Sequence, residues 1–309
     1  MSALHVVVGA GPLGSGVASL LAARGERVRV VRRSGTSRVA GVQTVAGDVT
    51  DAEFARHALA GASVVYQCAQ PRYHRWPQEF ETLQERILDA AAAAQARVVI
   101  ADNLYAYGDP RGAVIGEHSP REPHTVKGLL RKRMAEAALA DDRIEVALSR
   151  PSNYIGPDYA VFGSAVVRPA LRGRAMQFLG SMDVAHSFSY IPDSAAAMVA
   201  LASSDRSWGR GWITPVLEPV TQSRLASLVW AAAGASGEPR TSVMGPRLAA
   251  VLGVMAPDLG ALREMWFEFE HPYVVDSGEF EREFGLTPTP IDVAVQATVQ
   301  ATVESFRQA

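Results

Sequence analysis

The N-terminal stretch constrains the fold of this chain more than any other part of it. It begins with Leu4–Val8, a β-branched apolar run that is typical of a buried strand. A turn with three glycines follows, at Gly9, Gly11 and Gly14. Apolar residues then recur at helical spacing, and a second strand-like run occupies 27–31. The pattern predicts a strand, a glycine turn, a helix and a second strand, which together form one βαβ unit.

The residue types in this turn are those that a bound dinucleotide requires. Gly9 allows a tight turn, Gly11 lets the main chain approach a pyrophosphate, and Gly14 lets the helix pack close to its strand. Pro12 and Leu13 open the helix, whose free N–H groups and partial positive charge suit phosphates. We therefore predict cofactor contacts from this whole turn. The alternative interpretation is a glycine turn that binds no ligand.

The end of the second strand indicates which dinucleotide is bound. A site that prefers NAD places an acidic residue there for the ribose 2′-hydroxyl, whereas Arg32 and Arg33 offer two guanidinium groups to a 2′-phosphate. This favours NADP, with NAD left open. The alternative is a solvated basic strand end, because arginine is common throughout the chain.

Strand-like and helix-like segments continue to alternate after this unit. We expect strands near 42–45, 63–68, 97–101, 144–149 and 211–214, and helices near 51–59, 78–94 and 126–140. Such alternation predicts an α/β Rossmann fold, a doubly wound parallel sheet that binds ligands at the carboxyl ends of its strands. We expect the nucleotide-binding domain at 1–157, continued around 188–215, and a smaller C-terminal, substrate-covering subdomain from 158–187 and 216–309.

Composition excludes several classes of function. The net charge of −2 gives no electrostatic case for binding nucleic acid or an anionic membrane. The single cysteine, Cys68, rules out an internal disulfide, which fits a cytoplasmic location, and no grouping of His, Asp and Glu suggests a metal site. We expect neither an export signal nor a membrane-spanning segment, and a small molecule as the partner. Homodimerisation is left open.

Several short motifs together resemble one family over nearly the whole chain. They are the N-terminal glycine turn, Gly47-Asp48, Cys68-Ala69, Tyr107-Gly108-Asp109, Arg150-Pro151-Ser152-Asn153, Tyr190-Ile191-Pro192-Asp193 and the segment 280–290. The resemblance is to the extended short-chain dehydrogenase/reductases, also called the NAD-dependent epimerase/dehydratase family. It implies a Rossmann sheet, bound NAD(P) and a substrate pocket roofed by the C-terminal part.

The same resemblance implies positions for further residues around the cofactor. Asp48 and Val49 would lie beside the adenine, and Ala69 and Gln70 along the cofactor. The motif after the sixth strand would add Pro151 and Asn153 to the cofactor contacts.

The departures from the family pattern concern its catalytic residues. The family has a Ser or Thr after the fifth strand and a Tyr-x-x-x-Lys pair on the next helix. Here Asn103 stands at the expected serine position, and Lys127 and Arg131 stand at the tyrosine and lysine positions. The first gap of the glycine turn is also one residue shorter than usual. The chain therefore resembles an atypical member, whose chemistry the family tyrosine cannot supply.

The replaced pair still suggests a chemistry. Lys127 and Arg131 are four residues apart, so both project from one helical face. Arg131 can hydrogen-bond the nicotinamide ribose as the family lysine does. Neighbouring positive charge disfavours the ammonium form of Lys127, which makes it a candidate proton donor and acceptor or an amine nucleophile. The alternative is an ordinary exposed lysine at the start of a helix.

Other polar residues are further candidates for the site. Tyr105, in the loop after the fifth strand, is the first candidate acid, and Asn103 could donate a hydrogen bond to a developing oxyanion. Tyr154 and His186 are candidate substrate contacts, although loop aromatics are more often pocket walls. His186 occurs where nucleotide-sugar enzymes of the family hold an arginine for the substrate phosphate, which argues against such a substrate.

Three interpretations of function compete. The first is an NADP(H)-dependent oxidoreductase that acts on a small, fairly apolar carbonyl or alcohol. The second is a lyase, epimerase or cyclase on the same scaffold, in which the dinucleotide is structural or recycled in place. The third is a non-catalytic NADP(H) sensor. Polar residues at all three former catalytic positions favour catalysis over sensing.

Overall fold

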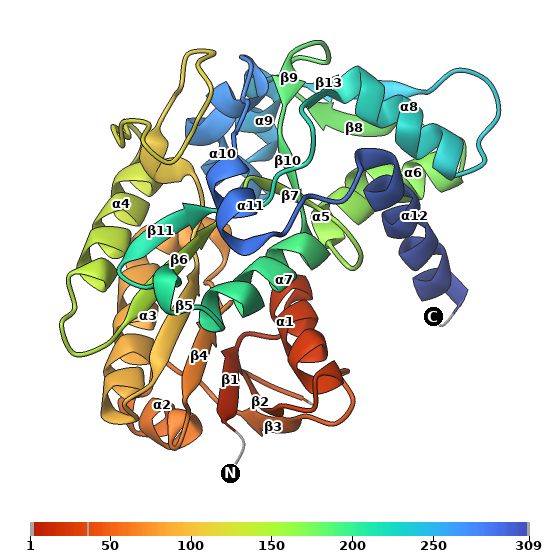
Figure 1. Ribbon diagram of the computed structural model, residues 1–309. Coiled ribbons are helices and arrows are strands. Elements are labelled where there is room, and N and C mark those ends of the chain that lie inside the picture. Colours follow the sequence, from red (N-terminus) through yellow and green to blue (C-terminus); the bar gives the residue numbers. More distant parts are fainter. Residues whose placement is uncertain (1–2, 36, 308–309) are drawn as a thin grey trace. The chain divides into compact units, whose positions relative to one another are not determined.

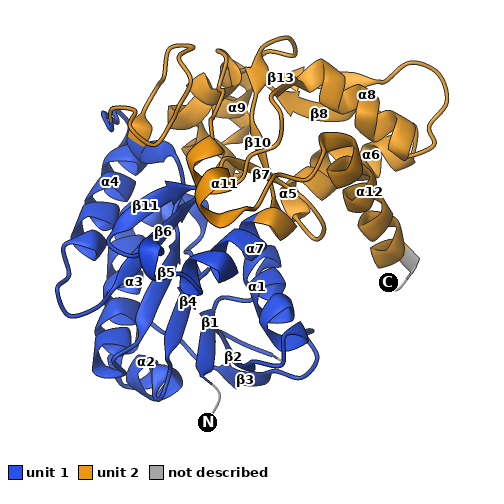
Figure 2. Ribbon diagram, in the orientation of Figure 1, with its two compact units in different colours: residues 1–106, 121–151, 194–214 blue, residues 107–120, 152–193, 215–309 orange. Residues whose placement is uncertain are grey.

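Helices and strands alternate through the first two thirds of the chain in a computed structural model that describes residues 3–35 and 37–307 (Figure 1). Two units are distinguished by their internal contacts (Figure 2). The first unit comprises residues 1–106, 121–151 and 194–214, and the second comprises 107–120, 152–193 and 215–309. Three segments that we expected in the nucleotide-binding part group with the second unit instead: 107–120, 152–157 and 188–193.

The first unit is built on a seven-stranded sheet in which every pair of neighbouring strands is parallel. Its strands in spatial order are β11 (Arg210–Ile213), β6 (Val146–Arg150), β5 (Arg97–Ala101), β4 (Val64–Gln67), β1 (Leu4–Val8), β2 (Arg27–Arg32) and β3 (Gln43–Ala46). The order reverses direction between β1 and β4, which is the switch point where doubly wound sheets bind ligands. The predicted fold class is confirmed.

Helices cover both faces of this sheet, because its strands are apolar on both sides. Helices α2, α3 and α4 lie on one face, and α1 and most of α7 lie on the other (Figure 1). Their bounds are α1 Pro12–Ala23, α2 Ala52–Leu59, α3 Trp76–Ala93, α4 Val126–Leu139 and α7 Ile191–Ala202. Asp51 caps α2 by accepting hydrogen bonds from Glu53 N and Phe54 N, as its position in the sequence predicts.

The second unit has shorter elements around its own apolar core. Its strands pair in three two-stranded sheets: β7 (Asn153–Ile155) with β10 (Phe188–Tyr190), β9 (Ala185–His186) with β12 (Val220–Thr221), and β8 (Met176–Leu179) with β13 (Thr241–Met244). Its helices are α5 Ala160–Phe162, α6 Arg168–Leu171, α8 Gln222–Ala232, α9 Pro246–Leu252, α10 Pro257–Leu262, α11 Gly278–Phe284 and α12 Ile291–Arg307. That this unit covers a substrate stays a prediction.

Candidate functional site

Two of the three glycines in the N-terminal turn, Gly9 and Gly14, are required by the fold, and the third, Gly11, is not. Gly9 has φ +103°, and a Cβ there would lie 2.6 Å from Ala69 N. A Cβ on Gly14 would collide with the Gly9 carbonyl, so the helix packs against the turn as predicted. Gly11 has φ −71°, which any residue adopts, and a Cβ there would meet nothing within 4 Å. The protein itself therefore leaves open the space in front of Gly11.

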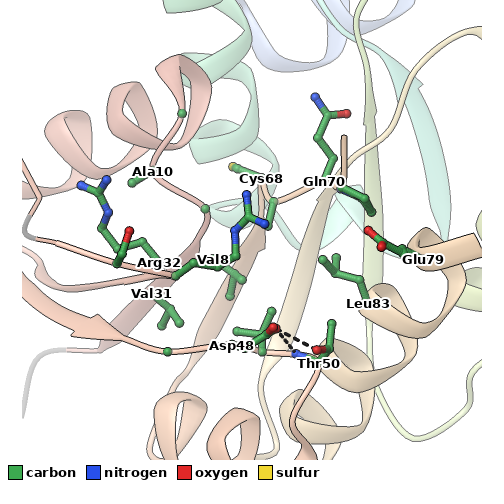
Figure 3. Close-up of a pocket in the computed structure, with 18 of the residues that line it drawn as sticks. Val8, Ala10, Val31, Arg32, Asp48, Thr50, Cys68, Gln70, Glu79 and Leu83 are labelled. Atoms are coloured by element: carbon green, nitrogen blue, oxygen red, sulfur yellow. Dashed lines mark hydrogen bonds between the residues drawn. The ribbon is translucent and has the colours of Figure 1, made fainter. Parts of the chain in front are cut away.

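A cavity of about 730 Å³ lies in the first unit where β1 to β4 end (Figure 3). Most of the residues predicted around the dinucleotide line it: Gly9, Gly11, Arg32, Arg33, Asp48, Val49, Ala69 and Gln70. They come from loops that follow four different strands, which explains how residues far apart in the sequence meet at one place. Pro12 and Leu13 begin α1 beside this cavity without lining it, and Gly14 is buried.

The charged groups in this cavity come from three of its walls. Arg32 is the last residue of β2, and Arg33 follows it and is exposed. Hydrogen bonds from Thr50 N at 2.9 Å and Thr50 Oγ1 at 2.8 Å lower the pKa of Asp48, and the charge of Arg33 acts in the same direction. Asp48 is therefore an oriented carboxylate at the edge of the cavity, with its Thr50 partner shown in Figure 3.

One wall of the cavity was missed by the sequence reasoning. Gln78, Glu79, Thr82 and Leu83 line it from α3, and Figure 3 shows Glu79 and Leu83 on that helix. The helical periodicity predicts α3 but not which of its faces meets the cavity. The Glu79 carboxylate is paired with Arg75, one turn earlier, at 2.6 Å.

A short segment joins this cavity to a cluster of aromatic rings. Pro71 lines the cavity, and its carbonyl accepts a hydrogen bond from the Trp76 indole at 3.3 Å. Tyr73 lies between them in the short helix η1 (Tyr73–Arg75), with its ring edge-on to Trp76 at 5.0 Å. Neither aromatic residue was singled out from the sequence, because an isolated aromatic in a loop carries no signal of its own.

The aromatic cluster brings together two of the predicted catalytic residues. Lys127 is only 3% exposed, and its Nζ lies 4.6 Å from the centroid of the Tyr73 ring. The Tyr73 and Tyr105 hydroxyls are 3.1 Å apart. The alternative interpretation, in which Lys127 is an ordinary exposed lysine at the start of a helix, is therefore wrong, because the side chain is buried. Tyr73 contacts both Lys127 and Tyr105 and so links the two predicted catalytic residues.

Close backbone packing holds the start of α4 against the loop that follows β5 and carries Tyr105. A Cβ on Gly128 would lie 2.8 Å from the Tyr105 carbonyl, so only glycine allows this approach. Thr125 caps the helix by accepting a hydrogen bond from Gly128 N at 3.0 Å. Asn103 accepts a hydrogen bond from Tyr105 N through its side-chain oxygen at 3.1 Å, which leaves its amide N–H groups as the donors for any oxyanion.

Arg131 has a buried partner in the protein. Its Nε lies 3.1 Å from Asp102 Oδ1, and the Arg150 Nε lies 3.0 Å from the other oxygen, Asp102 Oδ2. All three side chains are at most 2% exposed. The Arg131 guanidinium also lies 4.7 Å from the Phe80 ring. The ribose contact proposed for Arg131 stays a prediction, and the observed contact instead ties α4 to the ends of β5 and β6.

The remaining predicted residues near the end of β6 are divided between the units: Pro151 is the last residue of its segment in the first unit, and Asn153 and Tyr154 belong to the second. Pro151 directly follows β6 and is buried. Asn153 and Tyr154 belong to β7, and Tyr154 packs edge-on against Tyr159 at 6.2 Å. Their cofactor and substrate contacts stay predictions.

His186 lies in a buried polar cluster of the second unit. Its Nδ1 is 3.0 Å from the Glu268 carbonyl, and its Nε2 is 3.1 Å from Asn153 Nδ2. The same Asn153 nitrogen donates to Glu268 Oε2 at 3.0 Å. Burial lowers the pKa of His186 to about 4, although the hydrogen bond to the Glu268 carbonyl acts the other way. His186 is thus a neutral ring with both nitrogens engaged.

Glu268 is the unexpected member of this cluster. Burial raises its pKa to about 7, partly offset by hydrogen bonds from Asn153 and Tyr273. It occurs as a single acidic residue inside Trp266-Phe267-Glu268-Phe269, where a charged group among aromatic residues was the only available signal.

The described residues contain neither a candidate metal site nor a candidate membrane-spanning helix. Within residues 3–35 and 37–307, no three His, Cys, Asp or Glu side chains are grouped so that they could hold a metal ion. Over the same described residues, no helix is both long and apolar enough to pass through a bilayer.

The family is decided by a match to most of the chain. The family model described as "NAD dependent epimerase/dehydratase family" matches residues 5–211. The chain belongs to that family. The predicted family is confirmed, and the expectation of an enzyme is confirmed with it. NAD dependence is part of this family's description, and a preference for the phosphorylated dinucleotide goes beyond it. No curated protein matched the sequence.

Solved structures of the epimerase/dehydratase type share the fold over nearly the full length. MoeE5 in complex with UDP-glucose and NAD is 20% identical, with a TM-score of 0.77, and 98% of this chain and 99% of that chain are covered. UDP-glucose 4-epimerase from Thermotoga maritima, with UDP-glucose, is 17% identical, with a TM-score of 0.78 and coverages of 98% and 99%. The dTDP-glucose 4,6-dehydratase DesIV from Streptomyces venezuelae, with NAD bound, is 19% identical, with a TM-score of 0.78 and coverages of 99% and 98%. At these identities the likeness concerns the fold alone.

Proposed function

We propose that this member of the NAD-dependent epimerase/dehydratase family is an NADP(H)-dependent oxidoreductase that acts on a small, fairly apolar carbonyl or alcohol. The observation that carries the proposal is the cavity at the ends of β1 to β4, which opens in front of Gly11 and is lined by Arg32 and Arg33. The dinucleotide, when bound, supplies or accepts a hydride. Proton donation and stabilisation of the developing oxyanion would come from side chains of the protein.

The fit of a dinucleotide rests on the contrast between the three glycines. Gly9 and Gly14 are explained by the fold, but neither conformation nor packing explains a glycine at position 11. A ligand that approaches the main chain closely does explain it. Gly11→Ala is therefore expected to leave the unfolding midpoint unchanged and to weaken dinucleotide binding. Titration calorimetry with the oxidised and reduced forms of NADP and NAD measures the binding, and no heat with any of them would refute the proposal.

The preference for NADP is supported by the charges where β2 ends. Arg32, Arg33 and Ser34 line the cavity there, and no acidic residue follows the strand to accept a bond from a ribose hydroxyl. Hydrogen bonds between a guanidinium and a phosphate contribute about 1.5–3 kcal/mol, or roughly 10- to 100-fold in affinity.

A matched pair of arginine variants tests this preference. Arg33→Ala is expected to weaken NADPH by roughly 10-fold or more and to leave NADH nearly unchanged. Arg27→Ala is the control, because Arg27 is an exposed arginine at the opposite end of the same strand. Equal losses for NADPH and NADH in Arg33→Ala would contradict recognition of the phosphate.

The catalytic assignment gives each polar group one role. Tyr105 is the proton donor to the substrate oxygen, Lys127 is the neighbouring cation, and the Asn103 amide donates a hydrogen bond to the developing oxyanion. Support comes from the joining of Lys127 and Tyr105 through Tyr73. Tyr105→Phe and Lys127→Met are expected to reduce NADPH consumption with a panel of small aldehydes and ketones without weakening NADPH binding. Full activity in both variants would overturn the assignment.

The choice of a small uncharged substrate is supported by the state of His186. A neutral histidine with both ring nitrogens engaged inside the protein offers no cation to a diphosphate. The family resemblance implies an arginine at this position in enzymes that bind nucleotide sugars, and two solved structures with a similar fold hold UDP-glucose. UDP-glucose and dTDP-glucose are the control ligands, and binding of either would refute this part of the proposal.

The second candidate is an epimerase, dehydratase or related lyase on the same scaffold. The match to the epimerase/dehydratase family favours it. Such an enzyme would convert substrate with no net change in the absorbance of reduced nicotinamide, which separates it from the reductase in one assay. A sensor would bind NADP(H) and convert nothing.

A further inference from the structure

We propose that Tyr73 is a proton-relay residue: it and Tyr105 form one phenol pair, in which Tyr73 returns a proton to Tyr105 after Tyr105 has protonated the substrate. The inference rests on the proposed function for its first step. It adds a positioning residue that neither the family match nor the sequence motifs indicate.

The geometry links the two phenols to each other. Their hydroxyl oxygens are 3.1 Å apart, within hydrogen-bond reach, and either can be the donor. Their rings meet edge-on at 6.5 Å, and Trp76 contacts both rings, at 5.0 Å from Tyr73 and 5.9 Å from Tyr105. The two hydroxyls are thus held in one place by aromatic packing, and each ring is only partly buried.

A cation is positioned to stabilise the charge that such a pair would carry. Lys127 Nζ lies 4.6 Å from the centroid of the Tyr73 ring, and this lysine is 3% exposed. Attraction between an ammonium and an aromatic ring is strengthened by the loss of solvent, and a phenolate charge delocalised into that ring increases it. The Tyr73 ring is therefore a favourable place for a transient negative charge.

The proton transfers balance in both directions. As the carbonyl carbon accepts a hydride, which NADPH would supply, the Tyr105 O–H bond breaks and the new O–H bond forms on the substrate oxygen. The Tyr73 proton then passes to the Tyr105 oxygen, which leaves a Tyr73 phenolate beneath the Lys127 ammonium. A proton from bulk solvent, carried by water, then returns to Tyr73, so that one solvent proton is consumed for each carbonyl reduced. In the oxidation of an alcohol each transfer runs in reverse.

Steady-state kinetics with the purified full-length chain, NADPH and the aldehyde and ketone panel provide the first test. Tyr105→Phe is expected to lower kcat by roughly 100-fold or more, the usual contribution of a general acid. Tyr73→Phe is expected to lower kcat by a smaller factor with KM unchanged and to move the alkaline limb of the pH profile to higher pH. The double variant is expected to be no worse than Tyr105→Phe, because Tyr73 acts through Tyr105. A wild-type pH profile in Tyr73→Phe, or independent additive losses, would overturn the relay.

An alkaline titration of tyrosinate absorbance needs neither substrate nor dinucleotide. The wild type is expected to form its first tyrosinate at lower pH than Tyr73→Phe does. Tyr66→Phe is the matched control: its hydroxyl is hydrogen-bonded to His5 Nδ1 at 3.2 Å, and burial raises its pKa, so this tyrosine does not contribute to the early signal. Identical curves for wild type and Tyr73→Phe would refute the pair. If no carbonyl compound is consumed, the proposed function fails, while this titration still decides the phenol pair.

Discussion

Each of the two units contains one deeply buried carboxyl group, and the two respond to burial in opposite ways. Burial alone raises the pKa of Asp102, but the charges and hydrogen bonds of Arg131 and Arg150 outweigh it and hold that pKa below 3.8. Glu268 is equally buried, and its pKa is raised to about 7 because its partners, Asn153 and Tyr273, are uncharged. The charge of the partners, and not the depth of burial, decides whether a buried carboxyl is ionised.

The largest change in stability is expected when the ionised carboxyl of Asp102 is removed. Asp102→Ala leaves two guanidinium groups in the interior without their shared carboxylate, so the free energy of unfolding at neutral pH is expected to fall by about 3–5 kcal/mol. Urea unfolding followed by circular dichroism measures this change. An unchanged midpoint would mean that the arginines find other partners at little cost.

A second prediction concerns the pH dependence that the neutral cluster produces. The pKa of Glu268 rises from 4.5 to about 7 on folding, so its ionisation removes about 3 kcal/mol of stability as the pH rises through that window. The pKa of His186 falls from 6.5 to about 4, so its protonation removes a similar amount as the pH falls through that window. The two effects oppose each other, and the wild-type contribution of this pair is expected to be nearly flat between pH 4.5 and 6.5.

Glu268→Gln separates the two effects. With the carboxyl gone, stability is expected to rise by about 1.4 kcal/mol for each pH unit between pH 4 and 6.5, the slope that His186 alone produces. Urea unfolding at several pH values measures this slope. A variant whose profile matches the wild type would show that Glu268 does not titrate in this range.

A smaller effect is expected from the phenol that hydrogen-bonds Glu268. Tyr273→Phe removes one of the hydrogen bonds that favour the carboxylate, so we expect a loss of about 1–2 kcal/mol at pH 8. At pH 5, where the carboxyl is protonated, the loss is expected to be smaller. Equal losses at both pH values would indicate that the phenol contributes packing alone.

The smallest effect is expected where a carboxylate meets an arginine in solvent. Asp205 lies 2.9 Å from Arg97, but its side chain is 89% exposed. Asp205→Ala should change the free energy of unfolding by no more than about 0.5 kcal/mol. This variant is the surface control for Asp102→Ala, and comparable losses in the two would refute the distinction between buried and exposed ion pairs.

Sequence reasoning predicted the first unit well, because local patterns determine much of it. The β-branched runs predicted the sheet strands to within a residue or two, including the late strand expected at 211–214 and observed at 210–213. The roles of Gly9 and Gly14 followed from general rules of turn and packing geometry. The cavity residues that follow the strands were predicted from the glycine turn and the family resemblance, whereas the wall from α3 was missed.

The contacts between distant side chains could not be predicted in the same way. Tyr73 and Glu268 have no motif around them, and their importance appears only when chain packing brings Lys127 or Asn153 beside them. The four-residue spacing put Lys127 and Arg131 on one helical face, and both are buried, but it gave no sign that Asp102 would bind Arg131. Hydrophobic periodicity indicates which face of an element is inside and says nothing about which polar partner it meets there.

The shared carboxylate at position 102 also limits how the protein can be redesigned. Because one acid faces two guanidinium groups, Asp102 is the position of the three that cannot be exchanged alone: its loss leaves two cations in the interior without their shared counter-charge. The exchange of one arginine for an apolar residue of similar volume instead leaves a one-to-one ion pair. A redesign of the core at this point therefore begins at an arginine and then exchanges the remaining pair together.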